Sequence, residues 1–288
     1  MATTLALRRR IKTARNISKT TRALQMIAAS RLKRAQEAAV SSRPYVNKLS
    51  DVSKSLAPRG HGQSDDVHPY MQVRKTTGKT LYVIISPDRG LCGALNTNLT
   101  REYLRFKNEN NSHFITVGKK IESVVSSTSK NLLAAFPFGN TLPSFGAVAP
   151  ITKIIDEQFL GGKVDAVKIL TTKFNSVFSQ SPQITDLLPV RLEEEVGTVA
   201  DGRVFEPSQQ DLLPALLKRY VEMVIFQQML ENYASFNGAQ MIAMQNATNN
   251  AKDVVNALTL LYNKARQEKI TKEILDITSG AVAMEQQQ

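Results

Sequence analysis

The C-terminal part of the chain constrains the fold more than any other stretch. Residues 211–279 contain a single proline, Pro214, and a single glycine, Gly238. A continuous helix of that length would be roughly 100 Å long at 1.5 Å per residue, whereas the mean globular helix has about 11 residues. One compact domain of a 288-residue chain cannot enclose such a helix. The pattern therefore predicts a helix that extends away from any globular core.

The apolar face of this helix is narrow. Its apolar and small residues recur three and four positions apart, which favours one partner helix over a sheet as the neighbour. The members of this face are Phe226, Leu230, Tyr233, Met241, Met244, Thr248, Ala251, Val255, Leu258, Tyr262 and Ala265. A matching, alanine-rich pattern over residues 3–56 predicts the partner helix, in which Pro44 is accommodated or introduces a bend.

Between the two helices the sequence alternates strand and helix patterns. The expected strands cover residues 81–86, 114–117, 132–138 and 164–174. The expected helices cover residues 96–108, 119–126 and 148–159. Later runs at 176–189 and 204–205 are expected to be edge strands or hairpin pieces. The alternation predicts an α/β fold class, in which a Rossmann-like α/β domain with a mainly parallel sheet is inserted between two long helices that pair as an antiparallel coiled coil.

Composition limits where such a protein functions. No apolar run reaches the roughly 18 to 20 residues that would cross a bilayer, and residues 1–10 lack the apolar core of a signal peptide. With one cysteine, Cys92, an intramolecular disulfide is impossible, as expected in a reducing compartment. The sequence therefore predicts a cytoplasmic protein that is neither inserted in a membrane nor exported.

The positive charge belongs to one element. The chain has a net charge of +12, and residues 1–34 hold ten Lys or Arg and no acidic residue. These charges are spread around the expected helix and would repel one another without a negatively charged surrounding. Nucleic-acid phosphates, an anionic membrane surface or an acidic protein cavity could each supply it.

The glycine motifs argue against a phosphate site. Residues 78–80 (GKT) precede a strand rather than follow one, and Val73 stands where a phosphate loop needs its first glycine. Gly90 and Gly93 lack the third glycine and the acidic partner of a dinucleotide fingerprint. We therefore expect a tight turn with close packing there.

Other reactive side chains do not assemble into a catalytic or metal-ligating set. Cys92 has no histidine near it in the sequence, and the three histidines are scattered at positions 61, 68 and 113. Glu273 and Asp276 lie on one helix face without an accompanying base or metal partner, so surface contacts are favoured. We expect no catalytic residue, no cofactor and no bound metal.

Several segments together resemble the gamma subunit of rotary ATP synthases. The segments that carry the resemblance are RRRIK at 8–12, MIAASRL at 26–32, DRGLCG at 88–93, FEPS at 205–208, RYV at 219–221, ITKEILD at 270–276 and SGA at 279–281. They cover both ends and the middle of the chain. Entry into a long helix without a transit peptide favours a bacterial form.

The resemblance implies a non-catalytic central rotor shaft of a proton-translocating ATP synthase. Such a subunit couples rotation of a membrane c ring to conformational change at the catalytic sites of a head of alpha and beta subunits. The implied partners are the alpha and beta subunits, the c ring and an epsilon-type subunit, with no nucleic acid. The membrane is met only through the c ring, so the expected location is peripheral, on the cytoplasmic face of a bacterial plasma membrane.

The same resemblance divides the chain and assigns contacts. The expected parts are an N-terminal shaft helix (1–57), a connector loop (58–78), the α/β domain (79–206) and a C-terminal shaft helix (207–288). The head-contact residues would be Arg8, Arg9, Lys12, Leu24, Met26, Arg31, Arg266, Gln267, Thr271 and Glu273. The foot, which meets the c ring, would be Arg43, Tyr45, Phe205 and Glu206. The tip, Ala281, Val282, Ala283 and Met284, would turn in an apolar bearing with Leu5 and Leu7 nearby.

One pair of positions departs from the family pattern. Where gamma subunits usually have Ser-Glu followed four residues later by Arg-Met, this chain has Ser235-Phe236 and Gln240-Met241. An ion pair and a positive contact are therefore missing at these positions. Restoring Glu at 236 and Arg at 240 is expected to add a contact without disturbing the helix.

Two other classes of function compete with a rotor shaft. A basic coiled coil that binds nucleic acid would use residues 8–34 on phosphates, but that stretch lacks interleaved aromatic residues. A nucleotide-dependent enzyme built on the α/β domain is weakened by the incomplete phosphate motifs. Co-purifying subunits or co-purifying nucleic acid would distinguish these alternatives.

Overall fold

The computed structural model describes residues 4–56, 68–73, 77–106, 112–129, 131–190 and 209–285. Its helices and strands, in chain order, are α1 (Thr4–Leu56), the 3-10 helix η1 (Pro69–Met71), β1 (Thr80–Ile85), α2 (Leu95–Phe106), β2 (Ser112–Val117), α3 (Lys119–Thr128), β3 (Leu132–Phe136), η2 (Phe145–Ala147), α4 (Ala149–Phe159), β4 (Ala166–Phe174), β5 (Gln180–Leu188) and α5 (Gln209–Glu285). The predicted order of elements is confirmed. The piece expected at 204–205 and most of the connector lie outside the described residues, and the domain bounds stay expectations.

The five strands form one sheet in the order β3-β2-β1-β4-β5. Strand β1 is parallel to both β2 and β4, and β2 is parallel to β3, whereas β5 is antiparallel to β4. Strand β1 is buried from Leu81 to Ile85, as its unbroken apolar run predicts for a central parallel strand. The prediction of a mainly parallel sheet is confirmed. Because the chain crosses from β1 to β2 on one side and returns to β4 on the other, the strand order reverses between β1 and β4.

Alternate residues of β1 point into the two cores of the domain. Tyr82 and Ile84 belong to a cluster that helices α2 and α3 cover, where Tyr82 stacks on Phe106 with ring centroids 4.4 Å apart. Val83 and Ile85 belong to a larger cluster on the other face, which includes side chains of α1, α4 and α5. Fully burying each large apolar side chain contributes about 1.5 to 3 kcal/mol, so both faces stabilise the sheet.

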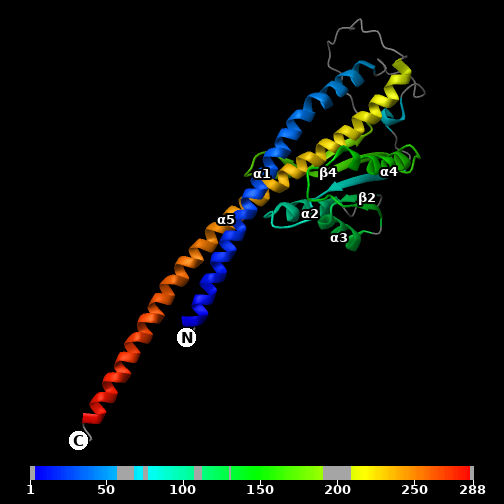
Figure 1. Ribbon diagram of the computed structural model, residues 1–288. Helices are drawn as coiled ribbons and strands as arrows, with labels where there is room; N and C mark the ends of the chain where they lie inside the picture. The colour runs from blue at the N-terminus through cyan, green and yellow to red at the C-terminus, as the bar shows by residue number, and fades with distance from the viewer. Residues whose placement is uncertain are drawn as a thin grey trace. The chain divides into compact units, whose positions relative to one another are not determined.

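The described residues form two compact units, one of residues 4–27 and 241–285 and one of the described residues between 28 and 240. In the first unit α1 and α5 lie side by side and run in opposite directions (Figure 1). The hydroxyl oxygens of Thr21 and Thr248 are 2.7 Å apart across this pair. The buried side chains of the pair are Leu7, Ile11, Ala14, Met244, Thr248 and Ala251. The predicted partner helix is therefore confirmed for this unit.

Helix α5 continues past the start of α1. An antiparallel register through Thr21 and Thr248 puts Leu7 opposite about residue 262, and roughly 20 residues of α5, or ~30 Å, follow that point. The expectation that Leu5 and Leu7 lie near the tip at 281–284 is therefore wrong. Leu7 is buried in the helix pair instead.

The second unit contains the sheet together with residues 28–56 of α1 and 209–240 of α5. Pro44 lies inside α1, so the helix accommodates it as predicted, and Pro214 lies near the start of α5. Ser42 of α1 donates a hydrogen bond to the Gln227 side chain of α5. Among the described residues no helix is both long and apolar enough to cross a bilayer.

Candidate functional site

Helix α5 occupies the place where an open α/β sheet ordinarily binds its ligand. That place lies outside the carboxyl ends of the strands, where the strand order reverses, here between β1 and β4. The Asn232 amide donates to the Ile85 carbonyl oxygen at 3.0 Å and to the Thr171 hydroxyl at 3.3 Å. The Ser235 hydroxyl donates to the Thr172 carbonyl oxygen at 3.0 Å. The sheet thus binds a helix of its own chain, and we call the surroundings of residues 232–239 the helix-binding crevice.

Every residue of α5 from 232 to 239 is buried. The Tyr233 ring lies 6.4 Å from that of Phe138, centroid to centroid, and its hydroxyl donates to the Asn140 carbonyl oxygen at 3.5 Å. At Gly238 an added Cβ would lie 3.1 Å from Cε2 of Phe174. A glycine inside a helix lowers its stability by about 0.5 to 1 kcal/mol relative to alanine. Here the Phe174 ring lies so close that a larger residue at 238 would press against it, which accounts for the glycine. The prediction that α5 packs against one partner helix through a narrow face is therefore wrong over residues 232–239, because neighbours surround the helix there.

The turn after β1 forms one wall of the helix-binding crevice. Phe236 packs with Ala239, Cys92 and Leu95 in a buried cluster. Burial raises the pKa of the Cys92 thiol, so the side chain remains protonated and packs as a small apolar group. Phe236 therefore makes apolar contacts at the position where gamma subunits usually have one member of an ion pair. Because position 236 is only 8% exposed, we now expect Glu there to disturb the packing of the helix, and the test of this prediction is given in the Discussion.

The turn that contains Gly90 and Gly93 was expected to be tight and closely packed, and only the first of these expectations is confirmed. Gly93 has a φ of +59° and Leu91 a φ of +63°, as a tight turn requires. Nothing lies within 4 Å of a Cβ built at Gly90 or Gly93, so the expected close packing is wrong. The turn needs glycine for its backbone conformation at Gly93 and not for space.

Polar contacts also hold α5 near its start. The Tyr70 hydroxyl donates to the Asp156 carboxylate, and burial followed by this hydrogen bond raises the pKa of Tyr70. Lys218 of α5 lies 3.8 Å from the same carboxylate. Arg219 stacks over the Phe145 ring at 4.0 Å, and its hydrogen bond with Tyr45 raises its pKa. One predicted foot residue, Tyr45, is thus attached to the first turns of α5.

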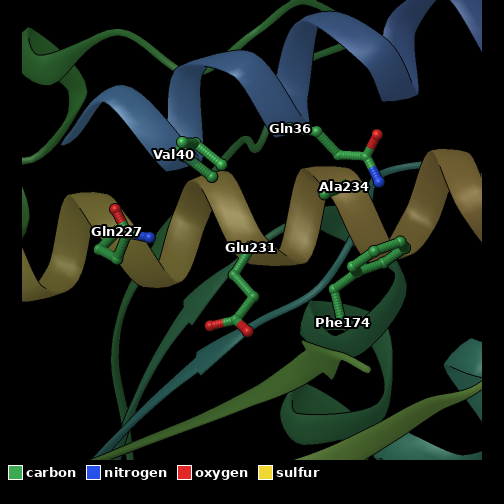
Figure 2. A pocket seen from close by; sticks show the side chains of 7 residues that line it. Gln36, Val40, Phe174, Gln227, Glu231 and Ala234 are labelled. Carbon is green, nitrogen blue, oxygen red and sulfur yellow. The ribbon is translucent and has the colours of Figure 1, made fainter. Parts of the chain in front are cut away.

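A cavity of about 350 Å³ in the second unit is lined by residues of α1, α5 and the end of β4. Figure 2 shows side chains of α1 and α5 around it, with Phe174 of the sheet on a third side. Its lining residues are Gln36, Ala39, Val40, Phe174, Gln227, Glu231 and Ala234. Four of these residues are apolar, and the polar ones are two glutamines and one glutamate, so the lining has no cation for a phosphate and a single carboxylate for a metal ion. Among the described residues no three His, Cys, Asp or Glu side chains lie close enough together to hold a metal.

The predicted head-contact residues lie on surfaces of α1 and α5. Those with exposed side chains are Arg8, Arg9, Lys12, Met26, Arg266, Gln267, Thr271 and Glu273. Leu24 and Arg31 are half-buried, and Arg31 belongs to the second unit. Phe205 and Glu206 lie outside the described residues, as do the side chains of Arg43 and of the tip at 281–284. The foot and bearing assignments therefore remain predictions.

The exposed surface of the first unit is basic and partly apolar. On α1 this unit carries seven Lys or Arg, at positions 8, 9, 10, 12, 15, 19 and 22, and none of them has a described acidic partner within 4 Å. The exposed apolar side chains of this unit include Leu5, Ile17, Met26, Leu260, Leu261, Ile270, Ile274, Leu275 and Ile277. Exposed apolar residues that gather into a patch are typical of surfaces that bind another protein.

Sequence reasoning missed the residues that line the helix-binding crevice. Asn232 and Ser235 lie among other polar residues of α5, such as Gln228 and Asn237, so no local signal in the sequence marked them as donors to the strand ends. Asp88 was also missed, although it stands in a motif quoted for the resemblance. Its contacts are described below.

Known proteins resemble the chain over its whole length. The profile of the family described as ATP synthase matches residues 3–284. The ATP synthase gamma chain of Dehalococcoides mccartyi (strain CBDB1) is 39% identical over 287 residues, which cover 99% of this chain and 100% of that protein. The gamma chain of Herpetosiphon aurantiacus is 37% identical over 298 residues, covering 99% of this chain and 100% of that protein.

Solved structures share the fold. The Euglena gracilis mitochondrial ATP synthase, solved as OSCP/F1/c-ring in rotational state 3, contains a chain that matches with a TM-score of 0.67 and 20% identity, covering 97% of this chain and 94% of that one. The rotor of the same enzyme in rotational state 1 matches with a TM-score of 0.65 and 20% identity, covering 93% of this chain and 98% of that one. On the full-length sequence match, the chain belongs to the ATP synthase gamma chain family.

Proposed function

We propose that this chain is the central rotor shaft of a proton-translocating ATP synthase. In this role it couples rotation of a c ring to conformational change at the catalytic sites of a head of alpha and beta subunits. The observation that carries the proposal is the 39% identity to a gamma chain over the full length of both proteins. The comparisons give no support to the alternative of a basic coiled coil that binds nucleic acid.

The helix-binding crevice supplies the mechanical link. A rotor subunit must pass torque between its α/β domain and its long helix without letting the helix turn in place. Hydrogen bonds from Asn232 and Ser235 to strand-end carbonyls fix the helix about its own axis. The close approach of Phe174 to Gly238 also resists rotation, because any turn would bring a larger side chain against the ring.

The surface of the first unit suits a surrounding head. An acidic or polar cavity of the head would neutralise the unpaired cations on α1. Apolar contacts with the head would bury the exposed isoleucines and leucines. We infer that the chain does no chemistry itself and that the reaction takes place on its partners. We also assign to it an epsilon-type partner on the α/β domain and a peripheral position on the cytoplasmic face of a bacterial plasma membrane.

Co-purification tests this function. A tagged full-length chain, isolated from its own cells in mild detergent, should bring down the alpha and beta subunits, an epsilon-type subunit and the c ring. In that complex residues 281–284 should resist proteolysis that removes them from the free chain, since the bearing would cover them. Nucleic acid without alpha and beta subunits would contradict the proposal and support the alternative.

The Arg266→Ala variant should lower ATP-driven proton pumping several-fold more than Gln240→Ala. Arg266 is exposed on α5 and free to hold a carboxylate of the head through charge-assisted hydrogen bonds, each worth about 1.5 to 3 kcal/mol. Gln240 is half-buried, and a neutral hydrogen bond from it is worth about 0.5 to 1.5 kcal/mol. Pumping in membrane vesicles at matched assembly levels measures the difference.

Lys264→Ala is the matched control for Arg266→Ala. Lys264 is an exposed cation two residues away, and its described partner is Glu268 of the same helix at 4.0 Å. Its removal should change pumping little, because an exposed pair of this kind contributes about 0 to 1 kcal/mol. Equal losses for Arg266→Ala and Gln240→Ala would contradict the torque assignment of Arg266.

The foot is tested by Glu206→Lys. If Glu206 pairs with a basic loop of the c ring, an exposed contact worth ~1 kcal/mol, reversing its charge should release the head from membranes more readily at low salt. Retention of the head on washed membranes measures this effect. Glu157→Lys, at an exposed position of α4, serves as the control. Unchanged retention and synthesis in Glu206→Lys would reject the assignment.

A further inference from the structure

The carboxylate of Asp88 joins the loops that follow three neighbouring strands. It stands just after β1, and its Oδ1 accepts hydrogen bonds from the backbone N–H of Lys119 at 2.9 Å and of Phe138 at 3.2 Å. Its Oδ2 accepts one from the N–H of Gly139 at 2.8 Å. Lys119 follows β2, and Phe138 and Gly139 follow β3. One side chain thus satisfies three backbone donors that converge at the carboxyl edge of the sheet.

These donors form the kind of site that binds an anion in other α/β proteins. Lys119 is the first residue of α3, and the N-terminus of a helix carries a partial positive charge with free N–H groups. The N-cap position of α3 is Gly118, which has no side chain to cap the helix. Two residues after β1 cap the helix instead: the Asp88 carboxylate accepts from the N–H of Lys119 at 2.9 Å, and the Ser86 hydroxyl accepts from the N–H of Ile121 at 3.2 Å. The exposed side chains of Lys119 and Lys120 add positive charge beside it.

The loop that Asp88 holds is also a wall of the helix-binding crevice. The Phe138 ring packs near Tyr233 of α5, and the carbonyl of Asn140 accepts from the Tyr233 hydroxyl. Phe138 and Tyr233 are both buried. Two of the three hydrogen bonds to Asp88 therefore fix the backbone immediately before Asn140.

We propose that Asp88 is an internal anion that fills the oxyanion-binding position of the sheet and thereby positions the loop at 138–140 against α5. The carboxylate takes the place that a phosphate or carboxylate ligand would occupy, so the sheet edge is closed to such ligands. Asp88 is a positioning residue. It acts on α5 through Phe138 and Asn140. This inference does not depend on the proposed rotor function.

Anion rescue of Asp88→Ala in the full-length chain tests the inference. Removing the carboxylate leaves three unpaired donors around a space the size of a small carboxylate, and the thermal midpoint should fall by about 4 to 8 °C. Sodium formate should restore at least half of this loss, compared with sodium chloride at the same ionic strength. Hydrogen exchange at residues 119, 138 and 139 should quicken in the variant and slow again with formate.

Two variants make the test specific to an anion at this position. Asp88→Asn fills the same space with a neutral amide, so it should be destabilised without responding to formate. Asp186→Ala removes an exposed carboxylate that pairs with Lys168 at 3.4 Å, and formate should not affect it either. A thermal midpoint of Asp88→Ala equal to that of the unmodified chain would overturn the proposal. So would a loss that formate fails to restore, or one that it restores equally in Asp88→Asn.

Discussion

Phe236→Glu should destabilise the chain by about 3 to 5 kcal/mol at neutral pH, although Glu is the residue that the resemblance to gamma subunits leads one to expect there. Phe236 is 8% exposed and packs with Cys92, Leu95 and Ala239, none of which can pair with a carboxylate. The variant loses the buried ring and places an ionisable group among apolar side chains. Thermal and urea unfolding followed by circular dichroism will measure the loss.

The destabilisation by Phe236→Glu should depend on pH in a defined direction. Burial disfavours the charged carboxylate, so the pKa of the new Glu is raised in the folded state above its unfolded value of about 4.3. The folded state then binds the proton more tightly than the unfolded state. Relative to the unmodified chain, the variant should therefore be least destabilised below pH 4.3 and should lose further stability as the pH rises through the folded pKa.

Phe236→Met provides the control for Phe236→Glu. Methionine keeps the site apolar and of similar size, and the cost should stay below about 1.5 kcal/mol without pH dependence. Adding Gln240→Arg to Phe236→Glu should not restore the lost stability, because the surroundings of position 236 remain apolar. Full stability of Phe236→Glu at neutral pH would show that the turn at Cys92 does not enclose this face of α5.

Gly118→Ala should prevent the α/β domain from folding, with a loss above about 4 kcal/mol. Gly118 has a φ of +108°, which L side chains rarely adopt, and a Cβ there would lie 2.0 Å from the Ser86 carbonyl oxygen. That oxygen belongs to backbone at the end of β1, so it cannot move away without disturbing the sheet. Soluble yield and the circular dichroism of the purified chain will report the effect.

Gly146→Ala is the matched glycine control. Gly146 has no heavy atom within 4 Å of an added Cβ and no positive φ. Its replacement should leave yield and thermal midpoint within about 2 °C of the unmodified chain, since a substitution with no clash or strain changes stability by about 0.5 kcal/mol or less. A folded, stable Gly118→Ala would mean that the junction of β2 and α3 has another backbone path.

The elements of this fold could be predicted because each is specified by local patterns. The apolar run at 81–86 and the absence of proline over 215–279, with Gly238 as the one glycine, identify a buried strand and a long helix within a few residues of their observed bounds. The alternation of strands and helices leads to a mainly parallel sheet, since parallel neighbours need crossover helices. The family could also be predicted from local patterns, because the resemblance rests on short motifs at both ends and in the middle of the chain.

Periodicity could not predict the helix-binding crevice. A hydrophobic pattern reports which face of a helix is apolar, but it does not say how many neighbours surround the helix. Asn232 and Ser235 are polar, and nothing local distinguishes a residue that faces water from one that donates to a strand end. Phe236 was interpreted through the ion pair it lacks, whereas its environment comes from the turn at Cys92, far away in the chain.

Local sequence patterns were enough to predict the helices, the order of the strands along the chain, the location of positive charge and the family. The folded chain was needed to see that α5 fills the ligand crevice of the sheet and that Asp88 closes the neighbouring edge. Those contacts join residues far apart in the sequence, with Asp88 reaching donors 31, 50 and 51 positions away. The groups that Asn232, Ser235 and Asp88 contact are mostly backbone N–H and C=O groups. Every residue except proline carries both groups, so the types of residue at the contacted positions do not reveal which side chain will pair with them.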